Sequence, residues 1–203
     1  VLATLEGNEL YRDFMDKLAS ANVDQYIDLP MIAVMGDTSS GKSSLLSAIA
    51  EIELPSSDKL TTRCPIMLQM KSSSRRTATV SVTWKDPPAD KSESERLFTP
   101  KSVDEASWDE LTGHIAAAQE HIVTMSGKEV ARDVVIVKLS SPRCEDLTLI
   151  DLPGIVRSTG KGESETLAQD MQGLIDVYLM SGRCVILAVH PAKVDFHNSQ
   201  LMA

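Results

Sequence analysis

The sequence predicts an α/β fold in which a mainly parallel sheet is flanked by helices. Short apolar runs of strand length recur along the chain of 203 residues, and segments with a helical spacing of apolar residues lie between them. Parallel strands need a long crossover connection, usually a helix, so this alternation favours a parallel sheet. Apolar residues make up 42% of the chain, which is enough to bury a sizeable core.

Strands are expected where an apolar run, or an alternation of polar and apolar residues, is bounded by turn-forming residues. The predicted strands span residues 31–35, 66–71, 77–84, 134–139, 147–150 and 185–189. The first of these lies between Pro30 and Gly36 and is apolar throughout, so it should be buried on both faces of the sheet. The last strand, also a continuous apolar run, should be buried as well.

Helices are expected where apolar residues recur every three or four positions. The predicted helices span residues 9–19, 42–52, 103–125 and 167–178. Gly127 is the expected stop after the third helix. Residues 86–96 are charged and contain Pro87-Pro88, so we expect a surface loop there.

The composition argues against several classes of protein. The formal net charge of −9 disfavours nucleic acid as a partner and a membrane-binding surface in this part of the chain. Cys64, Cys144 and Cys184 form no CxxC pair, which indicates free thiols in a reducing compartment. No signal peptide and no apolar run of transmembrane length are present, so the cytosol is the expected location. The chain does not begin with Met, and we expect a piece of a longer protein.

A phosphate-binding motif follows the first strand. Residues 36–43, GDTSSGKS, match the pattern G-x-x-x-x-G-K-[ST], with a buried strand before them and an apolar-faced helix after them. The alternative is a Gly/Ser-rich turn that matches the pattern by chance. The strand before the motif and the helix after it disfavour this alternative. Lys42 would neutralise the β- and γ-phosphates, and Ser43 would offer its hydroxyl to Mg²⁺. The predicted nucleotide-binding residues of the loop are Gly36, Asp37, Thr38, Ser39, Ser40, Gly41, Lys42, Ser43 and Ser44.

A second candidate site lies at the end of the predicted strand 147–150. The sequence LIDLPG delivers Asp151 at the end of an apolar strand and places Gly154 three residues later. P-loop enzymes need such an acid for the Mg²⁺ shell and a glycine whose N–H faces the γ-phosphate. The alternative is an aspartate that caps a turn after a strand. With the phosphate loop upstream, the functional interpretation is favoured.

These motifs resemble those of the dynamin superfamily of large GTPases. The resemblance is closest to Mx proteins and classical dynamins. The segments that carry it are LPMIAVMGDTSSGKSS (29–44), LP (54–55), TTRCP (61–65) and DLTLIDLPGI (146–155). The resemblance implies a three-layer P-loop NTPase fold. It also implies that residues 1–25 are the N-terminal helix of a bundle signalling element and that 26–203 are a GTPase domain, incomplete at its C-terminus.

The same resemblance implies roles for individual residues. Thr62 falls on the first switch threonine, which closes over Mg²⁺ and uses its carbonyl to place the attacking water; a solvent-facing loop threonine is the alternative. Ser39 falls on the serine that supports the transition state, partly by contacting a monovalent cation. The expected catalytic residues are Ser39, Lys42, Thr62 and Thr38, and the expected metal-binding residues are Ser43, Thr62 and Asp151.

Three departures from the family pattern affect this interpretation. Thr38 stands where the family usually has glutamine, and Ser57 and Lys59 stand where it usually has glycines. The guanine-reading motif [TN]-K-x-D does not occur. The preference for guanine over adenine is therefore implied by the resemblance alone.

The sequence predicts a GTPase that uses Mg²⁺ and converts GTP to GDP and phosphate. By resemblance, the intact protein would couple this cycle to self-association through the GTPase domain and a stalk. It would act in membrane remodelling or in an antiviral manner, from the cytoplasm or peripherally on membranes through regions outside this chain. The first alternative is a nucleotide-gated assembly protein with little or no hydrolysis, which Thr38 favours. The second is an unrelated P-loop ATPase.

Overall fold

The computed structural model describes residues 31–37, 39–55, 63–128, 130–154, 167–180 and 184–191. The chain divides into two units, Val1–Pro30 and Met31–Ala203, and every described residue belongs to the second. The predicted helix 9–19 and the domain assigned to residues 1–25 lie outside the described residues. Their assignment therefore stays a prediction.

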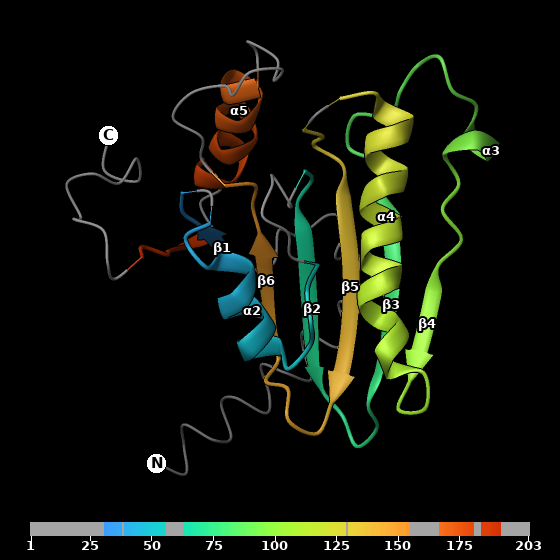
Figure 1. The fold of residues 1–203 in the computed structure, drawn as a ribbon, viewed down its shortest axis with the longest axis vertical. Helices are drawn as coiled ribbons and strands as arrows, with labels where there is room; N and C mark the ends of the chain where they lie inside the picture. Colours follow the sequence, from blue (N-terminus) through green and yellow to red (C-terminus); the bar gives the residue numbers. More distant parts are fainter. Residues whose placement is uncertain are drawn as a thin grey trace. The chain divides into compact units, whose positions relative to one another are not determined.

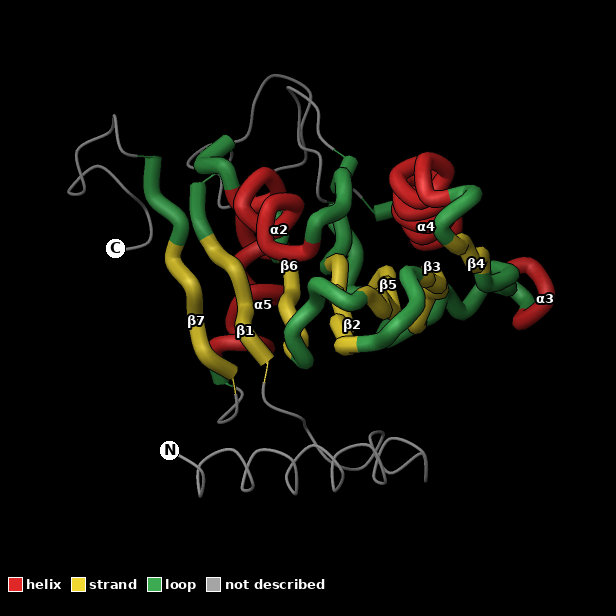
Figure 2. Tube along the Cα trace, turned by 90° about the horizontal axis from the view of Figure 1, so that it is seen from below, coloured by secondary structure: helices red, strands yellow, loops and turns green. Residues whose placement is uncertain are grey.

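The described part of the second unit contains a seven-stranded sheet with the order β4-β3-β5-β2-β6-β1-β7 (Figures 1 and 2). Its strands are β1 (Met31–Met35), β2 (Ile66–Ser72), β3 (Thr77–Thr83), β4 (Lys101–Asp104), β5 (Val134–Ser141), β6 (Leu147–Asp151) and β7 (Cys184–Ala188). The strand β1, which leads into the phosphate-binding motif, has the bounds that the sequence predicts. It is flanked by β6 and β7, and both pairings are parallel.

The rest of the sheet is mixed in direction. The pairing of β2 with β5 is parallel, whereas β2 with β6, β3 with β5 and β3 with β4 are antiparallel. The predicted α/β class is confirmed. The sequence did not predict that β2 runs against β6, because strand direction is set by partners distant in the chain.

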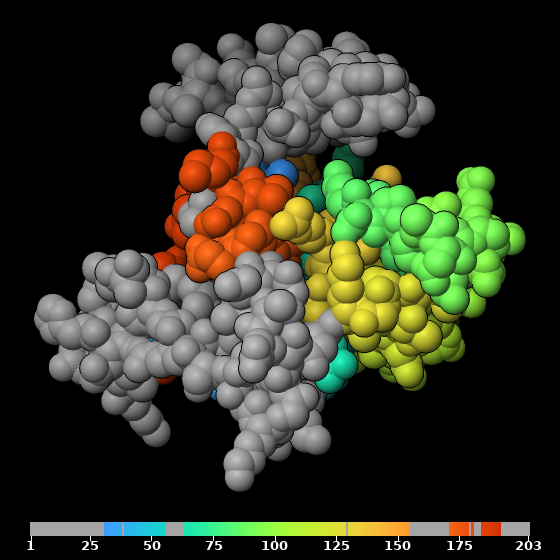
Figure 3. Space-filling model, turned by 90° about the horizontal axis from the view of Figure 1, so that it is seen from above, coloured from blue at the N-terminus to red at the C-terminus, as the bar shows by residue number. Residues whose placement is uncertain are grey.

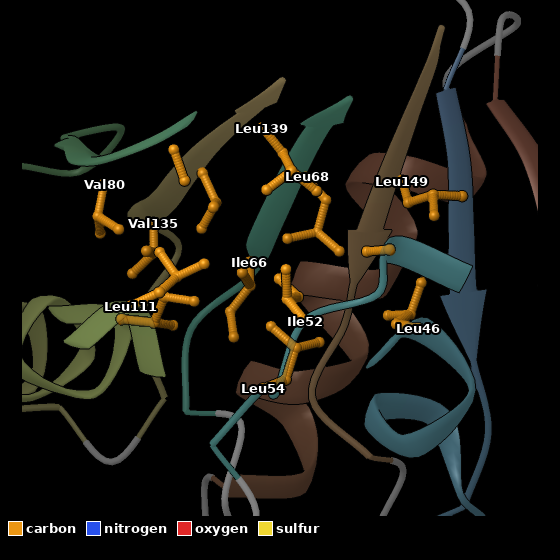
Figure 4. Close-up of a cluster of buried hydrophobic side chains, with 14 of the residues drawn as sticks. Leu46, Ile52, Leu54, Ile66, Leu68, Val80, Leu111, Val135, Leu139 and Leu149 are labelled. Carbon is orange, nitrogen blue, oxygen red and sulfur yellow. The ribbon is translucent and has the colours of Figure 1, made fainter. Parts of the chain in front are cut away.

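Helices cover both faces of this sheet. The helices are α2 (Lys42–Ala50), α3 (Glu93–Arg96), α4 (Leu111–Ser126) and α5 (Leu167–Leu179), with a 3-10 turn, η2 (Trp108–Glu110), before α4. Successive residues of β1 point to opposite faces, and Val34 packs in the same core as Leu46 of α2, whereas Ala33 packs with Ile175 of α5. The α2 and α4 side holds the larger core, part of which Figure 4 shows. Sheet and helices form three layers.

The structure corrects the predicted bounds of two helices. The helix predicted over 103–125 begins only at Leu111, because Val103 belongs to β4 and pairs with Ala78 of β3. Its predicted stop is confirmed, since Gly127 caps α4 with a positive φ of 63°. The helix predicted over 42–52 ends at Ala50, since Glu51 takes a left-handed conformation, with φ 51°.

Two further predictions were wrong. The surface loop expected over 86–96 contains the short helix α3, which begins with a capping box between Ser92 and Glu95. The strand expected to be buried at 185–189 is exposed in part, with Val185 at 64% and Ile186 at 42% exposure. Among the described residues β7 has β1 as its one neighbouring strand, which leaves its other edge open.

Candidate functional site

The phosphate-binding motif forms the connection between β1 and α2. Gly36 is tightly enclosed, because a Cβ atom at this position would collide with the Val189 carbonyl oxygen and with Ser40 Oγ. The loop then needs two positive φ angles, 60° at Ser39 and 97° at Gly41. The N-terminus of α2 has no side-chain cap. A helix start without a side-chain cap is suited to binding an anion through its first N–H groups.

The side chain of Lys42 is buried and lies inside this loop. Its Nζ donates to the carbonyl oxygens of Gly36 at 3.1 Å and Asp37 at 3.0 Å. Burial lowers the pKa of Lys42 below its ordinary value, while the negative charges of Asp151 and Asp37 oppose that shift. A buried cation that donates to neutral carbonyls is well placed to bind a charged phosphate oxygen instead.

The two candidate sites that the sequence predicted come together in the structure. Ser43 Oγ donates to Asp151 Oδ2 at 2.7 Å, although the two residues are 108 positions apart. Asp151 is fully buried at the end of β6, in register with Val34 of β1. Parallel pairing of β1 with β6 brings both strand ends to the same edge of the sheet. The phosphate loop and the LIDLPG segment therefore form one site.

The donor set at this site fits a magnesium ion. A serine hydroxyl and a carboxylate are hard oxygen ligands, and Mg²⁺ is usually held by one or two such groups together with substrate phosphates and waters. Among the described residues, no group of three or more His, Cys, Asp or Glu side chains forms a metal site of its own. Ser43 and Asp151 thus match a metal bound jointly with a nucleotide.

The remaining predicted residues are placed as follows. Ser39 and Ser44 are exposed and Gly154 is buried. Ser40 is buried, and its Oγ has no hydrogen-bond partner within the described part of the chain. Thr38 and Thr62 lie outside the described residues, as do Ser57 and Lys59. The roles assigned to these four residues therefore stay predictions.

One buried carboxylate near the same sheet edge was missed by the sequence analysis. Asp133 is only 1% exposed, and its Oδ1 accepts from the backbone N–H groups of Lys85 at 2.7 Å and Asp86 at 2.9 Å. Its one sequence signal is a charged residue directly before a strongly apolar strand. That signal does not distinguish a buried acid from a solvated one.

No helix among the described residues is long and apolar enough to cross a lipid bilayer.

Comparison with known proteins finds related sequences over nearly the whole chain. The family model described as "Dynamin family" matches residues 32–203. The chain is 33% identical over 190 residues to the interferon-induced GTP-binding protein Mx1 of Oncorhynchus mykiss, a match that covers 94% of this chain and 28% of that protein. It is 32% identical to the Mx1 protein of Bos taurus, over 94% of this chain and 27% of that protein. The chain thus spans little more than a quarter of these relatives' length.

Proposed function

Because the chain belongs to the dynamin family, we propose that it binds GTP with Mg²⁺ and hydrolyses it to GDP and phosphate. The observation that carries the proposal is the 2.7 Å contact between Ser43 and Asp151 beside the buried Lys42. This contact joins a phosphate-binding loop to the acid that P-loop enzymes require. The names of the Mx relatives, which describe them as GTP-binding, support GTP as the nucleotide.

Nucleotide binding would exchange the internal partners of Lys42 for phosphate oxygens. Lys42 Nζ now donates to two loop carbonyls, and a β- or γ-phosphate would offer a charged acceptor in their place. The uncapped N–H groups of α2 would face the same anion. Ser43, Asp151 and Thr62 would hold Mg²⁺, which neutralises charge on the β- and γ-phosphates.

Hydrolysis requires water to attack the γ-phosphorus while the bond to the β–γ bridging oxygen breaks. Positioning and electrostatics supply most of the acceleration in this class of reaction. In our proposal the Thr62 carbonyl places the water, Lys42 and the Gly154 N–H stabilise charge on the transferred group, and Ser39 assists with a bound monovalent cation. Thr38 directly precedes this assisting serine in the loop.

A second candidate function is nucleotide-gated assembly with little or no hydrolysis. It is favoured by Thr38, because threonine is shorter than glutamine and reaches a water near the γ-phosphate less well. The two candidates share every binding residue and differ only in the rate of phosphate release.

The activity of the whole protein is a wider part of the proposal. We infer that residues 26–203 act as a GTPase domain whose nucleotide state controls self-association with further copies, through this domain and a stalk. Contact with membranes would use other regions, and the expected location is the cytoplasm or the membrane periphery. Because the match covers 28% of the Mx1 relative, these roles belong to the proposal for the whole protein.

The test is a comparison of nucleotides with the intact protein. Binding of GTP, GDP and ATP is measured by calorimetry with and without Mg²⁺, and phosphate release is then measured with and without lipid vesicles. The proposal predicts Mg²⁺-dependent GTP binding, discrimination against ATP and phosphate release. GTP binding without release would favour gated assembly, and equal use of ATP would contradict the guanine assignment.

A further inference from the structure

The segment 130–133, which we call the clamp segment, lies between α4 and β5 and contacts separate parts of the molecule. The Ala131 N–H donates to the Arg63 carbonyl at 2.9 Å. Val130 packs against Met171 and Leu174 of α5. In Figure 3 the yellow part of the chain, around residues 125–135, lies between the orange-red α5 and the green segment near residues 85–96. The clamp segment thus joins the chain just before β2 to α5.

Asp133 fixes the end of the clamp segment. Its carboxylate accepts hydrogen bonds from the N–H groups of Lys85 and Asp86, which follow β3 after Trp84. Hydrogen bonds to a charged acceptor are stronger than neutral ones, and here both donors belong to the backbone. Removing the carboxylate would take the acceptor away from two partly buried hydrogen bonds. The clamp segment is therefore held by its own buried acid.

This acid lies at the edge of the sheet where Asp151 lies. Ile66 of β2 is in register with Asp151 of β6 on one side and with Val135 of β5 on the other. Asp133 comes two residues before Val135, so it lies just beyond that same edge. The Val135 N–H also donates to the Pro65 carbonyl at 3.0 Å. Residues 131–135 therefore hold the chain that enters β2 at two carbonyls, those of Arg63 and Pro65.

The residue between these two carbonyls is also enclosed. Cys64 is fully buried and packs in the larger core. Burial, together with the nearby Asp133 carboxylate, raises the pKa of its thiol to about 12. Arg63–Pro65 is thus fixed by backbone bonds on both sides and by a buried side chain in the middle. Thr62 directly precedes Arg63, and one peptide unit spans about 3.8 Å between Cα atoms.

We propose that Asp133 is a positioning residue for the nucleotide site, which acts by fixing Arg63–Pro65 and thereby favours a nucleoside triphosphate over a diphosphate. The inference rests on the proposed function, in which Thr62 contacts Mg²⁺ and the attacking water. A contact of that kind forms only while a γ-phosphate is present. Because Thr62 is bonded to Arg63, a fixed Arg63 limits the positions open to Thr62 and so lowers the entropy lost when that contact forms. A diphosphate bound through Lys42 and the phosphate loop needs no such contact.

The test compares two nucleotides in variants of the intact protein. Asp133→Ala removes the one oxygen that accepts both hydrogen bonds, and Asp133→Asn keeps an acceptor oxygen at the same place. The matched control is Asp146→Ala, which removes a carboxylate that accepts the Ser72 N–H at 2.7 Å at the opposite end of β2. Affinities for GDP and for a non-hydrolysable GTP analogue are measured with Mg²⁺. We expect Asp133→Ala to weaken analogue binding by about tenfold more than GDP binding. Asp133→Asn should recover most of that loss, and Asp146→Ala should not show it.

Equal weakening of both nucleotides, or of neither, would overturn the assignment. If Asp133→Ala does not fold, Asp133→Ser takes its place, because its shorter hydroxyl does not reach both N–H groups. Alkylation of Cys64, followed by mass spectrometry with the buried Cys144 as internal reference, tests the clamp without any nucleotide. Faster labelling of Cys64 in Asp133→Ala than in Asp133→Asn, which removes the same negative charge but keeps the acceptor, supports the clamp, and equal rates in the two variants contradict it. This arm tests the fixing of Arg63–Pro65 separately from the nucleotide preference, and a parent protein that binds no nucleotide would refute the proposed function.

Discussion

Two carboxylates, Asp151 and Asp133, are buried at the same edge of the sheet, on β6 and just before β5, and their partners differ in kind. Asp151 accepts from a side-chain hydroxyl, that of Ser43. This hydroxyl can rotate when a metal ion binds both side chains. Asp133 accepts from two backbone N–H groups, which cannot leave without moving the chain. The comparison teaches that a buried acid next to a mobile donor is suited to binding, whereas one held by backbone N–H groups is suited to fixing the chain.

The largest expected effect lies on the Asp151 side of this comparison. Lys42→Ala removes the one cation of the phosphate loop, which is buried and within electrostatic reach of Asp151. A charge-assisted bond to phosphate contributes about 1.5–3 kcal/mol, and more in a buried site. We expect calorimetry to detect no GTP binding by this variant of the intact protein. The control, Lys101→Ala, changes an exposed lysine on β4 and should bind as the parent does. Unchanged affinity in Lys42→Ala would refute the site.

The next effect separates the two acids by stability. Asp133→Ala removes two partly buried hydrogen bonds to a carboxylate, and we expect the free energy of unfolding to fall by about 1–3 kcal/mol. Compared in a Lys42→Met background, which removes the buried cation that the Asp151 charge supports, Asp151→Ala leaves a Ser43 hydroxyl that can rotate, so the loss should stay below about 1 kcal/mol. Urea denaturation without nucleotide measures both variants. Equal losses of unfolding free energy would contradict the view that Asp133 fixes the chain whereas Asp151 serves ligand binding.

The chemical step gives a smaller effect, which we predict from the sequence of the phosphate loop. Thr38→Gln restores the amide that reaches towards the γ-phosphate in the family pattern. We expect about tenfold faster phosphate release with nucleotide binding intact, which needs only about 1.4 kcal/mol off the barrier. The competing expectation is that Lys59 already supplies positive charge near the γ-phosphate. In that case Thr38→Gln would change little and Lys59→Gly would slow release.

Phosphate release from both variants decides between these expectations. If neither substitution changes the rate and the parent protein is already fast, the account of Thr38 is wrong. Asp146→Ala, at the far end of the sheet, serves as the control for indirect effects of substitution.

The same comparison shows what could be predicted from the sequence. Asp151 was identified because its surroundings are local in the chain: an apolar strand leads to it, and a glycine follows three residues later. The phosphate loop was identified for the same reason, since its glycines, its lysine and the strand before it are contiguous. Their contact across 108 residues follows once β1 and β6 are neighbours.

Features that depend on distant partners were not predicted. Asp133 is buried because Lys85 and Asp86, nearly fifty residues earlier, present two N–H groups to it. The same holds for Val103, which was assigned to a helix by its spacing but pairs with Ala78 at the sheet edge. The exposure of Val185 depends on which strands neighbour β7, and an apolar run alone carries no information about that.

The smallest effect is a pH dependence of stability that comes from Cys64, whose pKa the Asp133 carboxylate helps to raise. It is absent at neutral pH and appears only at alkaline pH. The pKa of Cys64 is raised from 9.0 to about 12, first by burial and then by the Asp133 carboxylate. The unfolded chain therefore releases this proton near pH 9, while the folded chain keeps it until about pH 12. The stability from this group is fully present below pH 9 and is lost as the pH rises to about 12, by at most about 1.4 kcal/mol per pH unit.

Cys64→Ala should therefore flatten the fall in the free energy of unfolding between about pH 8 and 10 by about 1 kcal/mol, whatever its effect on stability at pH 7. Tyr178, whose pKa is raised by burial from 10.0 to about 12, adds its own loss mainly above that window. Asp133→Asn should flatten the fall by a smaller amount than Cys64→Ala, because burial is the larger cause of the shift. Urea denaturation at a series of pH values measures each slope, with Cys184→Ala as the matched thiol control. A slope in Asp133→Asn identical to that of the parent would mean that this acid acts on Arg63–Pro65 through its backbone hydrogen bonds alone, and not through its charge.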